Sequence, residues 1–330
     1  MHVFVTGATG FVGHYVLGEL IRTGHTARCL LRRSSIDKLP IDRAEIVELE
    51  PFEAERAAGA KGAPGGKVEV VFGDVADAES LKGRLAGCDA VIHLVGVIDE
   101  NRRRGVTFER MNLEATRHIV NEARAAGVAR FVHMSANGAR GSEDASGYHR
   151  TKWQAEEIVR GAGFAGAVIF RPTIIFGDPG PGRPEFASRM AETLIRPFPI
   201  LPVLGDGRYR LQPIHISAVA AAFVQALTLE VPEGEVPAYC VAGEEEVEFD
   251  DLLDRITIAM GRRPKRKMHL PLWMSKSLVS TAGAAGLLPI SPAQFQMLQE
   301  GNTCDPTAFR ETFEYSPVPF EPAQMDYLAP

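Results

Sequence analysis

Short apolar runs alternate with amphipathic segments through the first half of the chain. The apolar runs, each predicted to be a buried strand, are Val3–Val5, Ala27–Leu31, Val68–Phe72, Ala90–Val95 and Arg130–Met134. Between them, apolar residues recur at helical spacing, most clearly in Val12–Ile21 and Met111–Ala126. This alternation predicts an α/β fold with a doubly wound parallel sheet.

A glycine-rich turn joins the first predicted strand to the first predicted helix. Gly7, Gly10 and Gly13 are each separated by two residues, so the backbone can turn sharply, approach an anion and let the helix pack on the strand. Amide groups at the start of the helix would then face a phosphate. The turn predicts a Rossmann-type dinucleotide site, and the alternative is a tight turn without a ligand.

Residues at the ends of the next strands are placed to meet the rest of a dinucleotide. Guanidinium groups at Arg32 and Arg33 would attract a 2′-phosphate, which favours NADP over NAD unless both side chains are simply solvated. Asp74 is placed either to meet the adenine edge or to act as a loop or N-cap carboxylate. Gly96 would let a cofactor pass over the sheet edge, and His93 is interpreted as a core residue.

A tyrosine and a lysine four residues apart open the helical pattern that runs to Val159. Tyr148 and Lys152 share one helix face, so the ammonium would lower the phenol pKa from about 10. Tyr148 could then exchange a proton with a substrate oxygen while a nicotinamide cofactor moves a hydride. Ser135 stands 13 residues before Tyr148 at a predicted strand end, where ligands bind in open α/β sheets. These three residues are the predicted catalytic set.

A Gly- and Pro-rich stretch from Gly177 marks a change of pattern. Residues 1–175 are predicted to form the dinucleotide-binding domain, with 211–243 returning to it. Residues 176–210 and 244–330 are predicted to form a smaller, mostly helical substrate-binding region. The returning part is predicted to contain the strands Leu211–Ile216 and Ala238–Val241 and the helix Ala218–Leu229. Four arginines are candidates either for holding a substrate phosphate or for solvated, structural roles: Arg183, Arg189, Arg208 and Arg210.

Composition narrows the classes of function. The chain has 330 residues, 45% of them hydrophobic, and a net charge of −6, so no global positive field attracts it to nucleic acid. The first strand starts too close to Met1 for a signal peptide, and no apolar run approaches the roughly 20 residues that span a bilayer. The cysteines predict reduced thiols in a cytoplasmic protein without a metal site, because no two of them form a CxxC pair: Cys29, Cys88, Cys240 and Cys304.

In this order the motifs resemble those of extended or atypical short-chain dehydrogenases/reductases, which are related to NAD-dependent epimerases and dehydratases. The matching stretches are TGATGFVG at 6–13, GDV at 73–75, HLVG at 93–96, NLEAT from Asn112, Ser135, YHRTK at 148–152 and RPTIIFG at 171–177. RPTIIFG and LQPIHISAVAAAF are most similar to the branch that contains the dehydrogenase-like accessory subunit of respiratory complex I. The resemblance implies Tyr148 as acid/base, Lys152 on the nicotinamide ribose and Ser135 at the substrate oxygen.

Taken together, the motifs and the resemblance predict one set of cofactor contacts. They are Gly7, Thr9, Gly10, Phe11, Val12, Gly13, Arg32, Arg33, Asp74, Val75, Leu94, Gly96, Lys152, Pro172 and Ile174. The predicted function is an NAD(P)(H)-dependent oxidoreductase or epimerase/dehydratase-type enzyme acting on a carbonyl or hydroxyl group. Two alternatives stay open: a nucleotide-sugar epimerase, and a non-catalytic NADP(H)-binding accessory subunit, assembly factor or redox sensor.

Two positions depart from the family pattern. Ala136 and Asn137 follow Ser135, where active members usually carry consecutive hydroxyl residues. An offset of one residue would turn Ser135 away from the substrate, because side chains alternate faces along a strand. Ser217 stands where relatives commonly have Asp, and it is interpreted as structural.

A dense basic cluster precedes the mostly apolar segment Leu270–Ile290, which carries Trp273. The cluster consists of Arg262, Arg263, Lys265, Arg266 and Lys267. Cations beside an apolar segment are typical of a surface that rests on an anionic membrane, and this would suit a hydrophobic small-molecule substrate such as a quinone or lipid-linked carbonyl. The favoured interpretation is solvated charges followed by a helix over the substrate pocket, with peripheral contact at the inner membrane face as the alternative. The oligomeric state is not predicted.

Overall fold

The computed structural model describes residues 1–39, 46–48, 67–183, 185–271 and 302–329. The chain forms two compact units. Unit 1 comprises Met1–Arg171, Val219–Tyr239 and Glu311–Tyr315, whereas unit 2 comprises Pro172–Ala218, Cys240–Arg310 and Ser316–Pro330. Unit 2 therefore includes residues 172–175, 211–218 and 240–243, which were expected in the dinucleotide-binding domain. Unit 1 includes residues 311–315, which were expected in the substrate-binding region.

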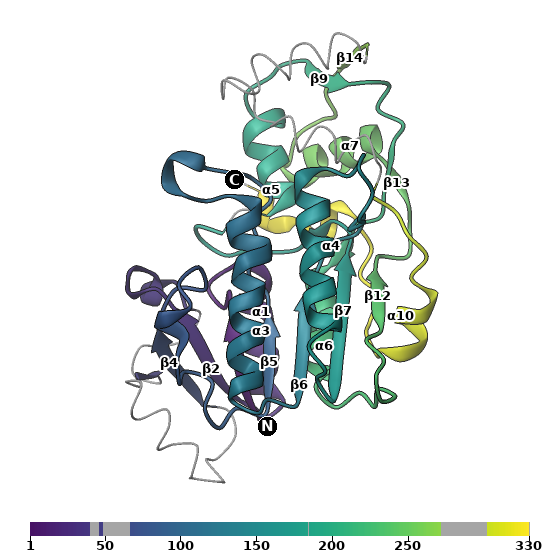
Figure 1. Cartoon of the computed structure of the whole chain (residues 1–330). Helices are drawn as coiled ribbons and strands as arrows, with labels where there is room; N and C mark the ends of the chain where they lie inside the picture. The colour runs from purple at the N-terminus through teal and green to yellow at the C-terminus, as the bar shows by residue number, and fades with distance from the viewer. Residues whose placement is uncertain (40–45, 49–66, 184, 272–301, 330) are drawn as a thin grey trace. The chain divides into compact units, whose positions relative to one another are not determined.

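An eight-stranded sheet organises the chain (Figure 1), in the order β12-β7-β6-β5-β1-β2-β4-β3. Its strands are β1 His2–Thr6, β2 Thr26–Leu31, β3 Ile46–Glu48, β4 Val68–Phe72, β5 Ala90–His93, β6 Arg130–Met134, β7 Gly166–Pro172 and β12 Ala238–Val241. The pairings from β3 across to β7 are all parallel. Because strands are added outward on both sides of β1, this is the doubly wound, Rossmann-type sheet that the sequence predicts.

Several elements differ from the sequence prediction, and β7 was not predicted as a strand. β3 at the sheet edge was not predicted, because a strand of three residues is too short to show a period. β5 ends at His93, two residues earlier than predicted. The predicted strand Leu211–Ile216 is two strands, β10 Arg210–Leu211 and β11 Ile214–His215. Pro213 lies between them and has no N–H to donate to a ladder.

Helices α1, α3 and α4 pack on the sheet of unit 1 (Figure 1). Their bounds are α1 Phe11–Arg22, α3 Ala115–Ala125 and α4 Gly147–Arg160, and a π-helical turn over Glu109–Glu114 leads into α3. Helix α6 covers Ile216–Gln225, starting two residues and ending four residues before the predicted bounds. Short 3₁₀ turns cover Arg33–Lys38, Glu79–Leu81, Arg102–Arg104, Pro322–Gln324 and Asp326–Leu328. The core of unit 1 forms where apolar side chains of the strands meet the buried faces of α3 and α4, among them Phe4, Val91, Ile119, Phe131 and Val159.

Unit 2 contains small sheets and short helices in its described residues. β11 pairs with β8 Ile175–Phe176, β10 with β13 Val247–Glu248, and β14 Lys267–Leu270 with β9 Leu201–Leu204. The helices are α5 Phe186–Met190, which continues as a π-helical turn over Ala191–Ile195, α7 Phe249–Ala259 and α10 Thr307–Thr312, the last of which starts in this unit. Its core gathers Phe176, Leu201, Phe249, Leu252 and Phe320. In the part of the chain that the structure describes, no helix has the length and apolar character to cross a bilayer.

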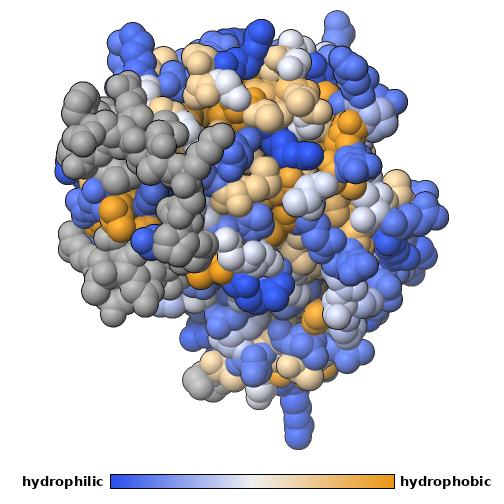
Figure 2. All heavy atoms as spheres, turned by 90° about the horizontal axis from the view of Figure 1, so that it is seen from below, coloured by the Kyte–Doolittle hydropathy of each residue, from blue (hydrophilic) through white to orange (hydrophobic). Residues whose placement is uncertain are grey.

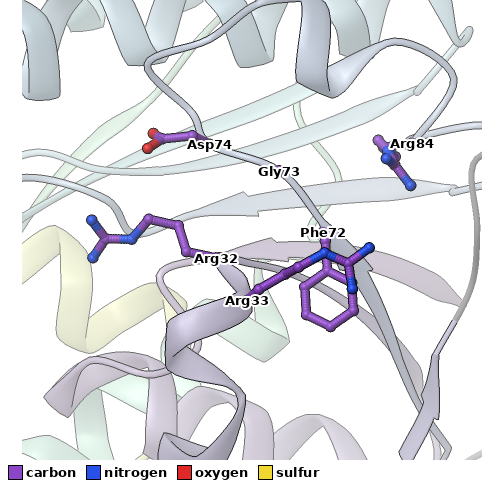
Figure 3. A pocket seen from close by; sticks show the side chains of 6 residues that line it. All are labelled: Arg32, Arg33, Phe72, Gly73, Asp74 and Arg84. Carbon is purple, nitrogen blue, oxygen red and sulfur yellow. The ribbon is translucent and has the colours of Figure 1, made fainter.

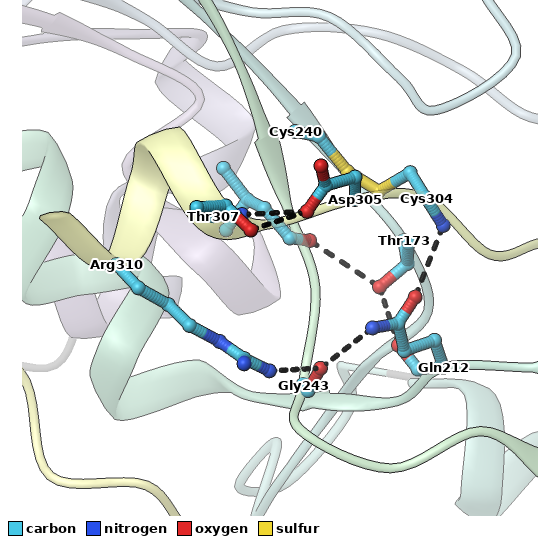
Figure 4. Close-up of a disulfide and its surroundings, with 9 residues drawn as sticks. Thr173, Gln212, Cys240, Gly243, Cys304, Asp305, Thr307 and Arg310 are labelled. Atoms are coloured by element: carbon cyan, nitrogen blue, oxygen red, sulfur yellow. Dashed lines mark hydrogen bonds between the residues drawn. A yellow bond between two sulfur atoms is a disulfide. The ribbon is translucent and has the colours of Figure 1, made fainter.

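A disulfide joins Cys240 in β12 to Cys304 (Figure 4), so the prediction of four reduced thiols is wrong for this pair. Their Cα atoms lie 6.4 Å apart although 64 residues separate them in sequence. Gln212 braces the same place: its side-chain amide donates to Gly243 O at 2.8 Å, and its Oε1 accepts the amide of Cys304 at 3.0 Å. Spacing alone gives no sign of a bridge that depends on folded neighbours. The remaining cysteines are free and buried: Cys29 and Cys88.

Candidate cofactor and catalytic site

The glycine turn begins where β1 ends and leads directly into α1. Gly7 has a φ of +80°, in the left-handed region, and its carbonyl accepts the amide of Gly10 at 3.0 Å. A Cβ on Gly13 would lie 2.1 Å from Gly7 O, so α1 can pack this closely only with glycine at that position. Gly10 is the N-cap and supplies no side-chain acceptor. The turn therefore fits a phosphate held by the first amides of α1.

The end of β5 lies beside this turn. The amide of Leu94 donates to Thr6 O at 3.2 Å, and a Cβ on Gly7 would lie 3.3 Å from Leu94. A Cβ on Gly96 would lie 3.3 Å from Asn112 Oδ1 and 3.4 Å from Lys152 Nζ. A side chain at position 96 would therefore crowd the Asn112 carboxamide and contact the Lys152 ammonium.

A surface cavity of about 360 Å³ opens beyond the ends of β2 and β4 (Figure 3). Its lining includes Arg32, Arg33 and Asp74, three of the predicted cofactor contacts, together with Phe72 and Arg84. The Arg33 guanidinium lies 4.4 Å from the centre of the Phe72 ring, a cation–π contact that orients this arginine. Phe72 and Arg84 were not predicted as site residues. Phe72 is the last residue of β4 and pairs with Leu31, the last residue of β2, so its place at a strand end was the signal available for it.

The two residues after Gly73 have different surroundings. Asp74 Oδ1 accepts the amide of Ala76 at 2.9 Å, the bond of a loop carboxylate, while the residue also lines the cavity. Both interpretations of Asp74 therefore have a structural counterpart. Val75 is 7% exposed and packs in the core of unit 1.

Tyr148 and Lys152 project from the first half of α4. The Ser146 hydroxyl caps this helix by accepting the amide of His149 at 3.1 Å. Lys152 is 3% exposed, and its ammonium donates to the carbonyl oxygen of Met134 at the end of β6. Burial lowers the pKa of Lys152 to about 8, an effect that the Glu156 carboxylate opposes.

Tyr148 does not show the lowered pKa that its spacing from Lys152 predicts. Its ring is partly buried and lies edge-on to Phe108, with centroids 5.9 Å apart. Burial raises the pKa of Tyr148 to about 12. The physical reason is that this phenol loses water on folding, while the ammonium that was expected to compensate is directed at a backbone carbonyl.

Ser135 belongs to a buried charge cluster beneath Lys152. Its hydroxyl donates to Glu156 Oε1 at 2.5 Å, and Arg171 binds the same carboxylate through Nε at 2.8 Å and Nη2 at 2.5 Å. Arg160 adds a contact at 2.9 Å. Burial alone would raise the pKa of Glu156, but hydrogen bonds from Arg171 and Ser135 and the charges of both arginines lower it. In this structure the Ser135 hydroxyl thus faces Glu156 of α4.

His93 is a core residue, as predicted. Its Nδ1 lies 2.7 Å from Thr6 Oγ1 and its Nε2 lies 3.1 Å from Thr116 Oγ1, while its ring stacks on His133. Burial, assisted by the charge of Lys152, lowers the pKa of His93 to about 3. Burial also lowers the pKa of His133. Both imidazoles are therefore neutral at pH 7.

A model of the NAD dependent epimerase/dehydratase family matches residues 3–241. The chain belongs to this family. It is 32% identical over 222 residues to the ceramide reductase of Caulobacter vibrioides, covering 67% of this chain and 59% of that protein. It is 26% identical over 273 residues to NADH dehydrogenase (ubiquinone) 1 alpha subcomplex subunit 9, mitochondrial, of Dictyostelium discoideum, covering 81% of this chain and 66% of that subunit. Each match spans less than two thirds of the relative's own length.

The epimerase/dehydratase family also has solved structures of the same fold. MoeE5 in complex with UDP-glucuronic acid and NAD aligns with a TM-score of 0.68 at 18% identity, covering 99% of this chain and 98% of that one. At this identity the likeness concerns the fold. The match to a complex I subunit confirms the resemblance predicted from RPTIIFG and LQPIHISAVAAAF.

Several predicted residues of this epimerase/dehydratase family member belong to unit 2. Pro172 is buried at the end of β7, and Ile174 packs against the core of unit 2. Arg210 pairs with Glu246 at 3.1 Å, which supports a structural role. Ser217 Oγ lies 2.7 Å from His215 Nδ1, also a structural contact. The remaining arginines stay predictions without an assigned ligand: Arg183, Arg189 and Arg208.

Proposed function

We propose that this chain is an NADP(H)-dependent oxidoreductase that interconverts a carbonyl and a hydroxyl group on a lipophilic small molecule. The observation that carries the proposal is the buried ammonium of Lys152, next to Gly96 and one helical turn from Tyr148. A buried cation is costly, and a strongly shifted lysine pKa in such a place is typical of a functional site. The backbone hydrogen bond from Leu94 to Thr6 joins the end of β5 to the end of β1, where the glycine turn begins.

The residues around the glycine turn fit a nicotinamide dinucleotide. The turn from Gly7 to Gly13 would hold the pyrophosphate, and Gly96 would let the cofactor pass over the edge of the sheet. Arg32 and Arg33 would bind a 2′-phosphate by charge-assisted hydrogen bonds, which is the reason to prefer NADP(H) over NAD(H). Arg84 lines the same cavity and would add a third guanidinium to this end of the cofactor site.

In the proposed reaction, residues of this chain carry out one proton transfer. A bound nicotinamide would supply or accept the hydride. Tyr148 would donate its proton to the substrate oxygen as the carbonyl is reduced, and Lys152, protonated below its pKa of about 8, would stabilise the phenolate left behind. Burial raises the pKa of Tyr148 to about 12, so its hydroxyl carries its proton at neutral pH, as the reductive step requires.

The names of two relatives support the substrate class. One is a reductase of ceramide and the other belongs to an NADH dehydrogenase that uses ubiquinone, and both molecules are lipophilic. Ser135 is proposed as a positioning residue, because its hydroxyl is engaged by Glu156. It would hold the end of β6, whose Met134 carbonyl accepts from Lys152.

A second candidate is a non-catalytic NADP(H)-binding protein. The unlowered phenol pKa of Tyr148 and the engaged hydroxyl of Ser135 favour it, and one relative is by name a subunit of an NADH dehydrogenase. In that case the cofactor would be bound without turnover.

NADPH consumption with a panel of ceramide-like ketones, quinones and nucleotide sugars tests the two candidates. For an enzyme, Tyr148→Phe should lower the rate on the accepted substrate by roughly 100- to 10,000-fold while the Kd for NADPH changes little. Tyr239→Phe, at a partly buried tyrosine of β12, is the matched control and should keep the wild-type rate. Tight NADPH binding with no turnover on any substrate would favour the accessory role. Unchanged turnover by Tyr148→Phe would contradict the assigned proton donor.

A further inference from the structure

An exposed apolar loop and a basic segment lie side by side in unit 2. The loop is Arg196–Ile200, with the sequence RPFPI, and all five residues are exposed. Within it, Phe198 is 37% and Ile200 is 48% exposed. Prolines at 197 and 199 flank the phenylalanine and restrict the backbone on both sides of it. This loop therefore presents large apolar side chains to solvent on a stiff support.

The basic segment follows α7 and is fastened to that loop. The Lys265 ammonium donates to the carbonyl oxygens of Ile195 at 2.5 Å and Phe198 at 2.7 Å. The amide of Leu201 donates to the carbonyl oxygen of Arg266 at 2.9 Å, and the parallel pairing of β9 with β14 continues the contact (Figure 1). On β14, Met268 is 52% exposed. One lysine therefore holds the loop and the basic segment together.

The charges on this surface are not balanced. Two of its cations have acidic partners within unit 2, Arg196 with Glu192 at 3.1 Å and Lys267 with Asp254 at 2.7 Å. Three further arginines of the segment have exposed side chains: Arg262, Arg263 and Arg266. In a protein with a net charge of −6, this is a local positive surface next to exposed apolar side chains.

We propose that this surface, the RPFPI loop with the arginines and Met268 beside it, docks on an anionic lipid membrane. The arginines would meet the phosphate headgroups, while Phe198, Ile200 and Met268 would enter the boundary between headgroups and acyl chains. The two loop prolines have no N–H, so fewer backbone donors lose water there when the loop is buried. The same prolines, with Pro202 in β9, disfavour an added peptide strand, so a membrane fits this surface better than a peptide partner.

Co-sedimentation of the full chain with vesicles tests this inference. We compare phosphatidylcholine vesicles with vesicles of phosphatidylcholine and phosphatidylglycerol, at low and at high salt. The protein should sediment only with the anionic vesicles and at low salt. The triple variant Arg262→Gln/Arg263→Gln/Arg266→Gln should weaken the partition coefficient on the order of 100-fold, because each cation near an anionic surface contributes about fivefold.

The chain offers a matched control with the same change of charge. Arg102, Arg103 and Arg104 are exposed in unit 1, and their triple change to Gln should keep wild-type sedimentation if the surface is specific. Phe198→Ser/Ile200→Ser should weaken binding, and a Phe198→Trp variant should add a blue-shifted emission on anionic vesicles, measured against wild type. Protein that stays in the supernatant at low salt overturns the proposal, as does equal loss in both arginine triples. Membrane binding does not require the proposed reaction, so NADPH consumption assayed without vesicles is an independent result.

Discussion

The two ends of the site in unit 1 hold their charges in opposite ways. At the proposed adenosine end, Arg32 and Arg33 are exposed around an open cavity. At the proposed catalytic end, Lys152 and Glu156 are 3% and 0% exposed, and both side chains have partners within hydrogen-bond distance. Exposed charges are solvated by water, so they can be exchanged at little cost to stability, whereas buried charges depend on their partners. We therefore expect substitutions at the exposed end to change cofactor preference, and substitutions at the buried end to change the free energy of unfolding.

The largest expected effect is at the buried end. Glu156→Gln should lower the free energy of unfolding by roughly 3–4 kcal/mol, because Arg171 and Arg160 lose the carboxylate that pairs them. Both arginines are 31% exposed, so water relieves part of this loss. Glu157→Gln is the matched control on the same helix: it is 49% exposed and should cost less than about 0.5 kcal/mol. Urea unfolding measures both, and equal values would contradict the contrast.

The buried histidine should make unit 1 sensitive to acid. His93 has a folded pKa of about 3, below its ordinary value of 6.5, so between these values the unfolded state binds a proton that the folded state does not. Stability from this group is present above pH 6.5 and falls by roughly 2–3 kcal/mol on going to pH 4.5. His93→Gln should remove that part of the slope. His118→Gln, at a half-buried histidine of α3, is the control and should keep the wild-type slope.

Two glycines of α1 should respond in opposite directions. Gly13→Ala places a Cβ against Gly7 O and should cost about 1–3 kcal/mol and abolish dinucleotide binding. Gly18→Ala meets nothing within 4 Å and should stabilise the helix by about 0.5–1 kcal/mol without changing cofactor affinity. Thermal unfolding and calorimetric titration with NADPH measure both variants. If Gly13→Ala still binds NADPH, the glycine turn is not part of the cofactor site.

The smallest change in stability is expected at the exposed end, where binding should change instead. Arg32→Gln/Arg33→Gln should leave the free energy of unfolding within about 0.5 kcal/mol of wild type. Its Kd for NADPH should rise roughly 10- to 100-fold while its Kd for NADH stays nearly constant, because charge-assisted bonds to the 2′-phosphate are lost. Arg22→Gln, at an arginine that is 70% exposed on α1, controls for the loss of positive charge. A preference for NADH in wild type would reject the assigned phosphate contact.

Local patterns in the sequence were sufficient for most strands of the sheet and for the glycine turn, but not for β3 and β7. The glycine turn contains Gly7, Gly10 and Gly13 within seven residues, so their spacing in the sequence is enough to predict how they lie in the structure. The helix that carries Tyr148 and Lys152 could be predicted for the same reason, since it depends on nearby residues. Local periodicity likewise placed β4 and β6 at their observed bounds.

Features that depend on distant residues could not be predicted. Arg171 lies 15 residues from Glu156 and reaches it only because β7 passes beside α4. Arg84 reaches the cavity through a loop, and Cys240 meets Cys304 across 64 residues. The pKa of Tyr148 was expected in the wrong direction because helical spacing says which residues share a face but not where an ammonium is directed. The predicted apolar segment Leu270–Ile290 lies outside the described residues from position 272 onward, as does Glu53–Lys67 up to position 66.

The disulfide between Cys240 and Cys304 makes a large part of unit 2 a covalent ring. In the unfolded chain this ring cannot open, which by chain-entropy arguments favours the folded state by about 4 kcal/mol. A protease that cuts the backbone once inside the ring would leave two pieces that migrate as one band until a reductant separates them. The concentration of reductant must therefore be controlled in every stability measurement on this protein, because reduction removes the covalent link within unit 2.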